Sequence, residues 1–308
     1  MADASPARGG ADSRLLPLLA LIGGACAIAF SPIFVRLTGT GPAAAGFWRL
    51  ALALPMLAPL SLARRPDGGL GVPGPSRITV LAGLFFALDL GFWHYGIRFT
   101  TVANATILAN LSPVFVTAGA WLFMGERPGR RFLAGLALAL AGVWAIAMAG
   151  GSGPGSQPVL GDALSVATAV WYAVYMLIVR RARGGRPAAE VMLWTSVVGA
   201  PLLLAAALIL RERILPLGVA GWAACAGMAV VHVTGQGAIA WALGRLPAAL
   251  ASVVILVQPV LAAILGWIVF AEPLGPLQIS GGALALGGVV LAQLGAARAA
   301  ERRSPVTK

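Results

Sequence analysis

Residues 93–127 read WHYGIRFTTVANATILANLSPVFVTAGAWLFMGER, and this stretch decides the fold. It adds polar and aromatic side chains to an otherwise lipid-like sequence, places Pro113 in the middle of an apolar segment and ends near an acidic residue, Glu126. The same landmarks return 146 residues later, where Pro113, Trp121, Glu126 and Gly129 fall on Pro259, Trp267, Glu272 and Gly275. Matches of alanine and leucine occur by chance in so apolar a chain, so the evidence for a repeat comes from the matched proline, tryptophan, glutamate and glycine. The pattern indicates an internal duplication.

The composition indicates which solvent surrounds the protein. Of the 308 residues, 59% are hydrophobic and 10% are charged, and the mean hydropathy is +0.89. Soluble domains carry roughly 25% charged residues, so a lipid bilayer is expected instead of water. A net charge of +12 also occurs in nucleic-acid-binding proteins. Here, however, the arginines lie in short gaps between apolar runs, as in cytoplasmic loops, and no nucleic-acid partner is expected.

Two cysteines, Cys26 and Cys225, lie inside apolar runs in opposite halves of the chain. A disulfide or a metal site needs partners and spacings that the sequence does not supply, so we interpret both as small buried hydrophobic residues. No cofactor and no metal are expected.

The apolar runs predict the number of membrane spans. A spanning helix needs about 20 mostly apolar residues. Ten stretches fit, at 15–34, 43–62, 78–97, 102–124, 132–149, 160–179, 189–210, 217–243, 248–270 and 277–295. The first run is longer than the apolar part of a signal peptide, so an uncleaved first span is expected. The sequence therefore predicts an all-α integral membrane protein with ten transmembrane helices.

The arginines predict how these spans are oriented. With a cytoplasmic N-terminus, 17 basic residues fall in cytoplasmic segments and 4 in external ones, in line with the positive-inside rule. Residues 15–149 and 160–295 form two five-helix repeats, between cytoplasmic tails at 1–14 and 296–308. Because five is odd, the repeats are expected to be inverted, as in many secondary transporters that bind substrate near the membrane midplane.

The repeated segments resemble a known family. They read NATILANLSPVF from 104, WLFMGERPGRRFLAGLALALAGV from 121 and ASVVILVQPVLAAILGWIVFAEPLGPLQISGGALALGGV from 251. GFWRLALALP at 46–55 and GDALSVATAVWYAVYMLIVRR at 161–181 add to the match. The chain is similar to the drug/metabolite transporter superfamily, in its ten-helix form with two EamA domains. The resemblance implies export or exchange of small metabolites, often amino acids or related compounds, across a bacterial inner membrane through a central cavity. The two repeats differ at one of these positions: Thr195 in the second repeat corresponds to Arg49 in the first, so the arginine is not repeated.

Ionisable residues within a span are functional candidates, because a charge in the hydrocarbon core costs several kcal/mol unless it is paired or hydrated. Arg49 and Asp89 lie at depths of roughly 10 and 13 Å, which permits an ion pair. Such a pair either fixes helix packing or serves proton coupling or substrate anchoring. His94 titrates near neutrality, which suits a proton-linked carrier. Its neighbours Trp93 and Tyr95 also suit an interfacial aromatic belt.

Polar and aromatic side chains within the spans are the candidates for binding a substrate. They are Trp93, His94, Asn104, Asn110, Trp171, Tyr175, His232, Gln236 and Gln258. The amides can bind a neutral or zwitterionic solute without the desolvation cost of a charge. His232 and Gln236, at i and i+4, share one helix face and suit either a cavity or hydrogen bonds between helices. Trp171 and Tyr175 suit either an aromatic wall or ordinary packing.

Other residues are interpreted as structural. Pro113 and Pro259 lie about 11 residues into their spans, near the bilayer centre, and are expected to break the helices. Each break should free a carbonyl four residues earlier, at Ala109 and Ile255, for a ligand or a neighbouring side chain. Glu126 and Glu272 are expected to act as caps at helix ends. The small residues of the fifth and tenth spans are expected to allow close backbone approach: Gly135, Ala139, Gly142, Gly281, Gly282, Gly287 and Gly288.

Three classes of function were weighed. The leading hypothesis is a secondary transporter of a small organic metabolite, acting as a monomer by alternating access. No G-x-x-x-x-G-K-[ST] motif is present, so the chain alone is not expected to use ATP. An intramembrane enzyme would need clustered His, Asp and Glu, but His94 and His232 are the only histidines and lack such neighbours. A non-transporting membrane sensor or assembly protein remains the alternative, although the short loops offer little surface.

Overall fold

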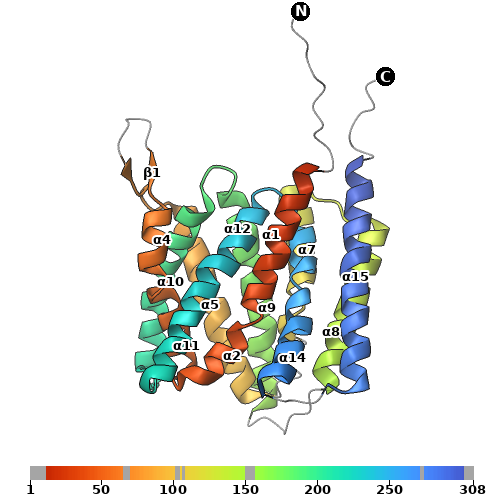
Figure 1. Ribbon diagram of the computed structural model, residues 1–308. Helices are drawn as coiled ribbons and strands as arrows, with labels where there is room; N and C mark the ends of the chain where they lie inside the picture. The colour runs from red at the N-terminus through yellow and green to blue at the C-terminus, as the bar shows by residue number, and fades with distance from the viewer. Residues whose placement is uncertain are drawn as a thin grey trace, which may run out of the picture.

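The computed structural model describes residues 12–64, 70–100, 105, 108–149, 157–270 and 274–301. This part of the chain is a bundle of helices that pass back and forth between two ends (Figure 1). A two-residue antiparallel ladder, β1 (Ala63–Arg64) with β2 (Leu70–Gly71), is the exception. Helix α1 begins and helix α15 ends at one end of the bundle, which we call the terminal end; the other is the far end.

The first half contains α1 (Asp12–Ile28), α2 (Ser31–Thr38), α3 (Pro42–Ala51), α4 (Leu54–Leu60), α5 (Arg77–Phe99), α7 (Ser112–Met124) and α8 (Arg130–Ala149). The second half contains α9 (Pro158–Ala182), α10 (Ala188–Ile209), α11 (Gly218–Val231), the π-helical turn η1 (His232–Gln236), α12 (Gly237–Leu243), α13 (Ala248–Val254), α14 (Val257–Phe270) and α15 (Pro276–Glu301).

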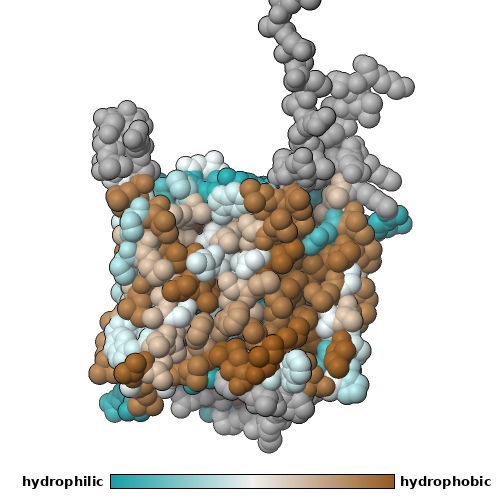
Figure 2. Space-filling model, in the orientation of Figure 1, coloured by the Kyte–Doolittle hydropathy of each residue, from teal (hydrophilic) through white to brown (hydrophobic). Residues whose placement is uncertain are grey.

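The bundle has the surface of a membrane protein. Among the described residues, eight helical segments are long and apolar enough to cross a bilayer. Figure 2 shows hydrophobic residues over the middle of the visible face and hydrophilic ones toward its upper and lower edges. Large apolar side chains such as Phe123 and Ile209 are 78% exposed, as expected of residues that face lipid. The expected span at 102–124 appears as the shorter apolar helix Ser112–Met124, because residues 101–104 and 106–107 lie outside the described part.

Several membrane helices are interrupted, and proline explains where. Short turns separate α1 from α2, α3 from α4 and α13 from α14, and another turn precedes α7. Each resumed helix carries a proline at its second or third residue: Pro32, Pro55, Pro259 and Pro113. Proline has no N–H and is tolerated in a first helical turn, where that donor would lack an intrahelical partner. The continuous spans expected at 15–34, 43–62 and 248–270 are therefore broken helices.

The expectation of a free carbonyl at Ile255 is wrong. The Ile255 carbonyl accepts a hydrogen bond from the Gln258 N–H at 2.9 Å, because the chain tightens into a short turn before Pro259. Within a bilayer no water is available to satisfy such a group, so the backbone supplies its own donor. This carbonyl is therefore not left without a donor by the helix break.

Helices α8 and α15 pack backbone to backbone through small residues. A Cβ atom on Gly142 would lie 2.3 Å from the Ala285 nitrogen, and one on Gly288 would lie 2.3 Å from the Ala139 nitrogen. Such approach is possible only for glycine, as expected from the sequence. Gly287, in contrast, has nothing within 4 Å of a built Cβ. The pair stands at one side of the bundle (Figure 1) and serves as scaffold.

Carboxylates join the two halves at both ends of the bundle. Glu126, just after α7, accepts hydrogen bonds from the Ala248 and Ala249 N–H groups at the start of α13. The structure therefore confirms Glu126 as a cap, whereas Glu272 lies outside the described residues. At the far end, Glu212 accepts hydrogen bonds from the Ala43 and Ala44 N–H groups at the start of α3. A carboxylate satisfies the unpaired N–H groups of a helix start and interacts favourably with its dipole.

Two tryptophans make matching contacts between the halves. The Trp48 indole donates to the Ile214 carbonyl in the loop before α11, at 2.8 Å. The Trp194 indole, which lies 146 residues further on, donates to the Pro73 carbonyl in the loop before α5, at 2.9 Å. These two tryptophans occupy equivalent positions in the two repeats, and each binds a loop of the other half: Trp48 at the far end and Trp194 at the terminal end.

Substitution of Gly288 by valine should destabilise the protein by about 1–3 kcal/mol, because the new side chain would overlap the α8 backbone. Thermal unfolding of the purified protein in detergent, followed by circular dichroism, measures this effect. Gly287→Val is the matched control, because it makes the same glycine-to-valine change at the preceding position, where a side chain meets open space. This variant should unfold near the wild-type temperature. Equal losses in both variants would contradict the packing described for α8 and α15.

Candidate functional site

A group of buried polar side chains lies inside the bundle, where five elements meet. We call it the central polar cluster, and it consists of Arg49 (α3), Asp89 (α5), Tyr175 (α9), Ser196 (α10), and His232 and Gln236 (η1). None of the six is more than 8% exposed. Burial of so many polar groups in a membrane bundle is costly, so such groups mark functional sites by default.

The ring of Phe86 on α5 holds the cluster together. It packs against the Tyr175 ring at a centroid distance of 4.6 Å and stacks on the His232 imidazole at 5.5 Å. The Arg49 guanidinium lies over the same ring, 5.8 Å from its centroid. An aromatic face attracts a cation, and this attraction strengthens where water is absent. Phe86 therefore offers one apolar surface to three chemically different groups.

Hydrogen bonds fix the positions of the second-half residues. The Gln236 amide donates to the Tyr175 hydroxyl at 3.4 Å, and that hydroxyl donates to the Met192 sulfur at 3.7 Å. The His232 Nε2 atom lies 3.2 Å from the Ser196 hydroxyl. Both His232 and Gln236 belong to the π-helical turn η1, and such turns interrupt α-helices at functional sites more often than elsewhere. The wider turn aims both side chains inward.

Several buried nitrogen atoms in this region lack a hydrogen-bond partner among the described residues. They are Arg49 Nε, His94 Nδ1, Trp171 Nε1 and His232 Nδ1. Unpartnered buried polar atoms are rare in native structures, because each costs about 1–3 kcal/mol. The Arg49 and Trp171 N–H groups are donors that can receive a ligand with acceptor oxygens, whereas each histidine Nδ1 donates or accepts according to its tautomer.

Arg49 and Asp89 lie near each other without forming a direct ion pair. Each is close enough to act on the other electrostatically. Yet no contact within 4.0 Å joins the two, and no other described residue makes a hydrogen bond to Asp89. The direct ion pair permitted by the sequence is therefore absent here, and both charges remain available to a third group.

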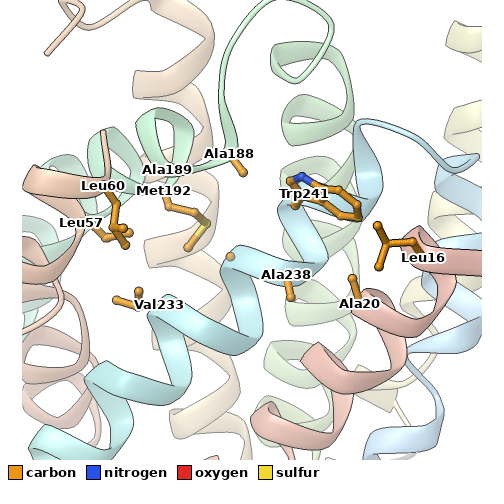
Figure 3. Close-up of a pocket in the computed structure, with 11 residues that line it drawn as sticks. Leu16, Ala20, Leu57, Leu60, Ala188, Ala189, Met192, Val233, Ala238 and Trp241 are labelled. Atoms are coloured by element: carbon orange, nitrogen blue, oxygen red, sulfur yellow. The ribbon is translucent and has the colours of Figure 1, made fainter. Parts of the chain in front are cut away.

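An apolar cavity of about 510 Å³ lies between helices near the terminal end and opens to the bundle surface at Leu16 and Leu60, which are 64% and 61% exposed. Figure 3 shows the side chains that line it. Its walls come from α1, α4, α10 and the segment from η1 to α12, with Leu16, Leu57, Met192, Val233 and Trp241 among the lining residues. Met192 belongs to both sites, since it lines the cavity and accepts the hydrogen bond from Tyr175. The cavity thus ends where the polar cluster begins.

The remaining candidate residues lie outside the central polar cluster. His94 is buried and acts electrostatically on Arg49, and its ring lies 5.0 Å from that of Trp93. Trp171 packs between Phe85 and Phe92, with centroid distances of 5.7 and 6.0 Å. These side chains border the cluster along α5 and α9.

Two amides that the sequence singled out, Asn110 and Gln258, are not in the cluster. Asn110 lines a separate pocket of about 290 Å³ against Leu140 and Trp144 of α8. Gln258 is on α14, and its amide nitrogen is buried without a partner among the described residues. Asn104 lies outside the described part of the chain. Pro113 and Pro259 stand directly after the helix breaks described above.

Sequence reasoning missed Phe86, Met192 and Ser196. Phe86 and Met192 are apolar residues in an apolar chain and resemble lipid-facing side chains. Phe86 is, however, three residues before Asp89, and hence on the same helical face, which was an available signal. Ser196 gave no such signal.

Comparison with known proteins identifies the family. The model of the EamA-like transporter family matches residues 15–148 and again residues 159–294. The chain belongs to this family. It is accordingly a multi-pass membrane protein of a transporter family, and the resemblance noted from the sequence is confirmed.

Individual relatives of this EamA-like protein are similar at low identity. An uncharacterized transporter of Archaeoglobus fulgidus is 24% identical over 84% of this chain and 90% of its own length. A probable terminal-alkyne amino-acid exporter of Streptantibioticus cattleyicolor is 28% identical over 86% of this chain and 88% of its own. The pseudopaline exporter of Pseudomonas aeruginosa is 26% identical over 70% and 72%. A crystal structure with 23% identity superposes with a TM-score of 0.77, covering 91% of this chain and 99% of the other, and shows a shared fold.

Ser196→Ala should destabilise the EamA-like protein by about 1–3 kcal/mol, because it leaves the buried His232 imidazole without a partner at Nε2. Unfolding of the purified protein in detergent with increasing denaturant measures the change. The control is the neighbouring Thr195→Val, since the buried Thr195 hydroxyl has no partner among the described residues and its loss should be neutral or stabilising. A larger loss from Thr195→Val than from Ser196→Ala would contradict the assigned hydrogen bond.

Proposed function

We propose that this chain is a secondary transporter that exports or exchanges a small organic metabolite, an amino acid or related compound, by alternating access. The observation that carries the proposal is the buried polar cluster at the end of an apolar cavity, inside a bundle whose outer surface suits lipid. Two relatives are named as exporters, one a probable terminal-alkyne amino-acid exporter and the other a pseudopaline exporter, and the first name supports an amino acid or related compound as cargo.

We further propose that the protein lies in a bacterial inner membrane as ten spans in two inverted repeats, with both termini in the cytoplasm. The excess of arginine in segments at the terminal end supports this orientation. The beginning of α1 and the end of α15 lie at the same end of the bundle, and Trp48 and Trp194 make equivalent bonds at opposite ends. A monomer is the proposed assembly, because the polar cluster draws all its residues from one chain.

The two ends of the bundle support an inward-facing conformation. The apolar cavity lies toward the proposed cytoplasmic end, between the first turns of α1 and α10 and the last turns of α4 and α12. At the far end, Glu212 binds the start of α3 and also accepts a hydrogen bond from the Tyr95 hydroxyl, which supports a closed far end. Thr100 and Asp162 add a hydrogen bond of 2.6 Å there. Release to the outside then requires these bonds to open while the cytoplasmic cavity closes.

Reconstitution into liposomes with a panel of amino acids and organic bases tests the proposed function. We expect counterflow of at least one compound at a rate several times that of protein-free liposomes. A folded, reconstituted protein that moves no member of a broad metabolite panel would count against a transporter and favour a membrane sensor or assembly protein.

Asp89→Asn and His94→Ala should change the pH dependence of transport if proton movement is coupled to it. Both side chains are buried near Arg49, and His232, Tyr172 and Tyr175 also face this region. Removing an ionisable group that exchanges protons should flatten the rate profile between about pH 5 and 8, the range over which histidine and perturbed carboxylates titrate. Initial rates in proteoliposomes with a clamped internal pH give the profile. Wild-type profiles in both variants would exclude coupling through these residues.

A further inference from the structure

The geometry points to Arg49 and Asp89 as a separated pair of charge anchors that a zwitterionic substrate bridges, with Arg49 holding its carboxylate and Asp89 its cationic group. This inference rests on the proposed transport function and specifies how that site recognises its cargo. It assigns to two buried side chains the selection of substrates that carry both charges.

The first argument comes from Arg49. Its side chain is 6% exposed, its Nε has no hydrogen-bond partner among the described residues, and its guanidinium lies over the Phe86 ring. A guanidinium presents a planar fork of donors that matches a carboxylate with two parallel hydrogen bonds. An aromatic face attracts the cation but accepts none of these hydrogen bonds. A buried arginine with unused donors therefore lacks an acceptor that a substrate carboxylate supplies.

The second argument comes from Asp89. It lies close enough to Arg49 for electrostatic interaction, yet the two do not meet within 4.0 Å. A pair whose task is to fix helix packing would be expected to close into direct contact, since that contact offsets the desolvation of both charges. A gap between opposite charges fits a ligand that carries its own opposite charges on two groups attached to one carbon, as an α-amino acid does.

The surroundings suggest how the rest of the substrate is held. The Phe86 and Tyr175 rings offer apolar faces beside the charges, and the 510 Å³ cavity next to them is lined by apolar side chains such as Leu57 and Trp241. The His232 Nδ1 atom is a further nitrogen without a partner among the described residues. A zwitterionic head at the Arg49–Asp89 gap with an apolar side chain toward the cavity matches this arrangement.

The experiment varies ligand and protein together. Each apolar L-amino acid, from valine to phenylalanine, is compared with its amide, which lacks the carboxylate, and with its deaminated acid, which lacks the ammonium. Competition against counterflow in proteoliposomes, and thermal stabilisation of the purified protein, give the preference for each compound. In the wild type we expect the amino acid to be preferred over both analogues by about tenfold or more. Each analogue lacks one charged group and so loses a hydrogen bond to a charged partner, which accounts for a preference of this size.

Variants then assign each preference to one residue. In Arg49→Gln the preference over the amide should vanish while that over the deaminated acid remains, and Asp89→Asn should show the reverse. Arg49→Lys, which keeps the charge but loses the fork, should retain part of the preference and serves if Arg49→Gln does not fold. Thr195→Val is the control and should keep both preferences. A residue that only supports the fold would weaken all compounds alike, so the crossed pattern separates anchoring from packing.

Four results would overturn the inference. They are equal handling of amino acids and amides by the wild type, preferences unchanged in both variants, parallel loss of both preferences in each variant, and lack of any effect from the whole amino-acid series. The proposed transport function is judged separately, by flux of any compound in the wider metabolite panel.

Discussion

A backbone inside a bilayer must satisfy its own hydrogen bonds, because no water is present to do so. Several irregular points in the described part of this EamA-like protein follow from that constraint. Where a helix is broken, a proline at the start of the next helix removes a donor that would otherwise be stranded, as at Pro32, Pro55 and Pro259. At the starts of α13 and α3, a carboxylate from the other half, Glu126 or Glu212, supplies the missing acceptor.

The same constraint explains where the polar cluster is built. A π-helical turn keeps its backbone bonded while it changes the direction of the side chains, and η1 uses this to place His232 and Gln236 beside Tyr175 and Ser196. The rigid pair α8 and α15 stands to one side and contributes nothing to the cluster. Scaffold and site are thus made by different helices: small residues where backbones must touch, and polar or aromatic residues where a ligand can bind.

Much of the fold could be predicted from the sequence, because lipid imposes a length and a hydropathy on each segment. The apolar runs, the repeat and the close packing of α8 on α15 could all be read from residue types. The breaks before Pro32 and Pro55 were missed: Pro32 lies near a span end, where proline is compatible with an unbroken helix, whereas Pro55 lies well inside its span and was an available signal. The site was harder to predict. Arg49, Asp89, His232 and Gln236 stood out as polar residues in apolar runs, whereas Phe86 and Met192 did not, because packing alone distinguishes a cavity wall from a lipid-facing side chain.

Helix α3 joins two features that have so far been described apart. Its first turn is held by the Glu212 carboxylate, and Arg49 lies near its other end, about 10 Å away along the axis. The turn before α4 makes this ten-residue helix a short rigid rod with a joint at one end. Any change in how Glu212 holds the rod would displace the guanidinium along or around that axis. The Glu212 contact at the far end and the Arg49 guanidinium are therefore mechanically linked through one short helix.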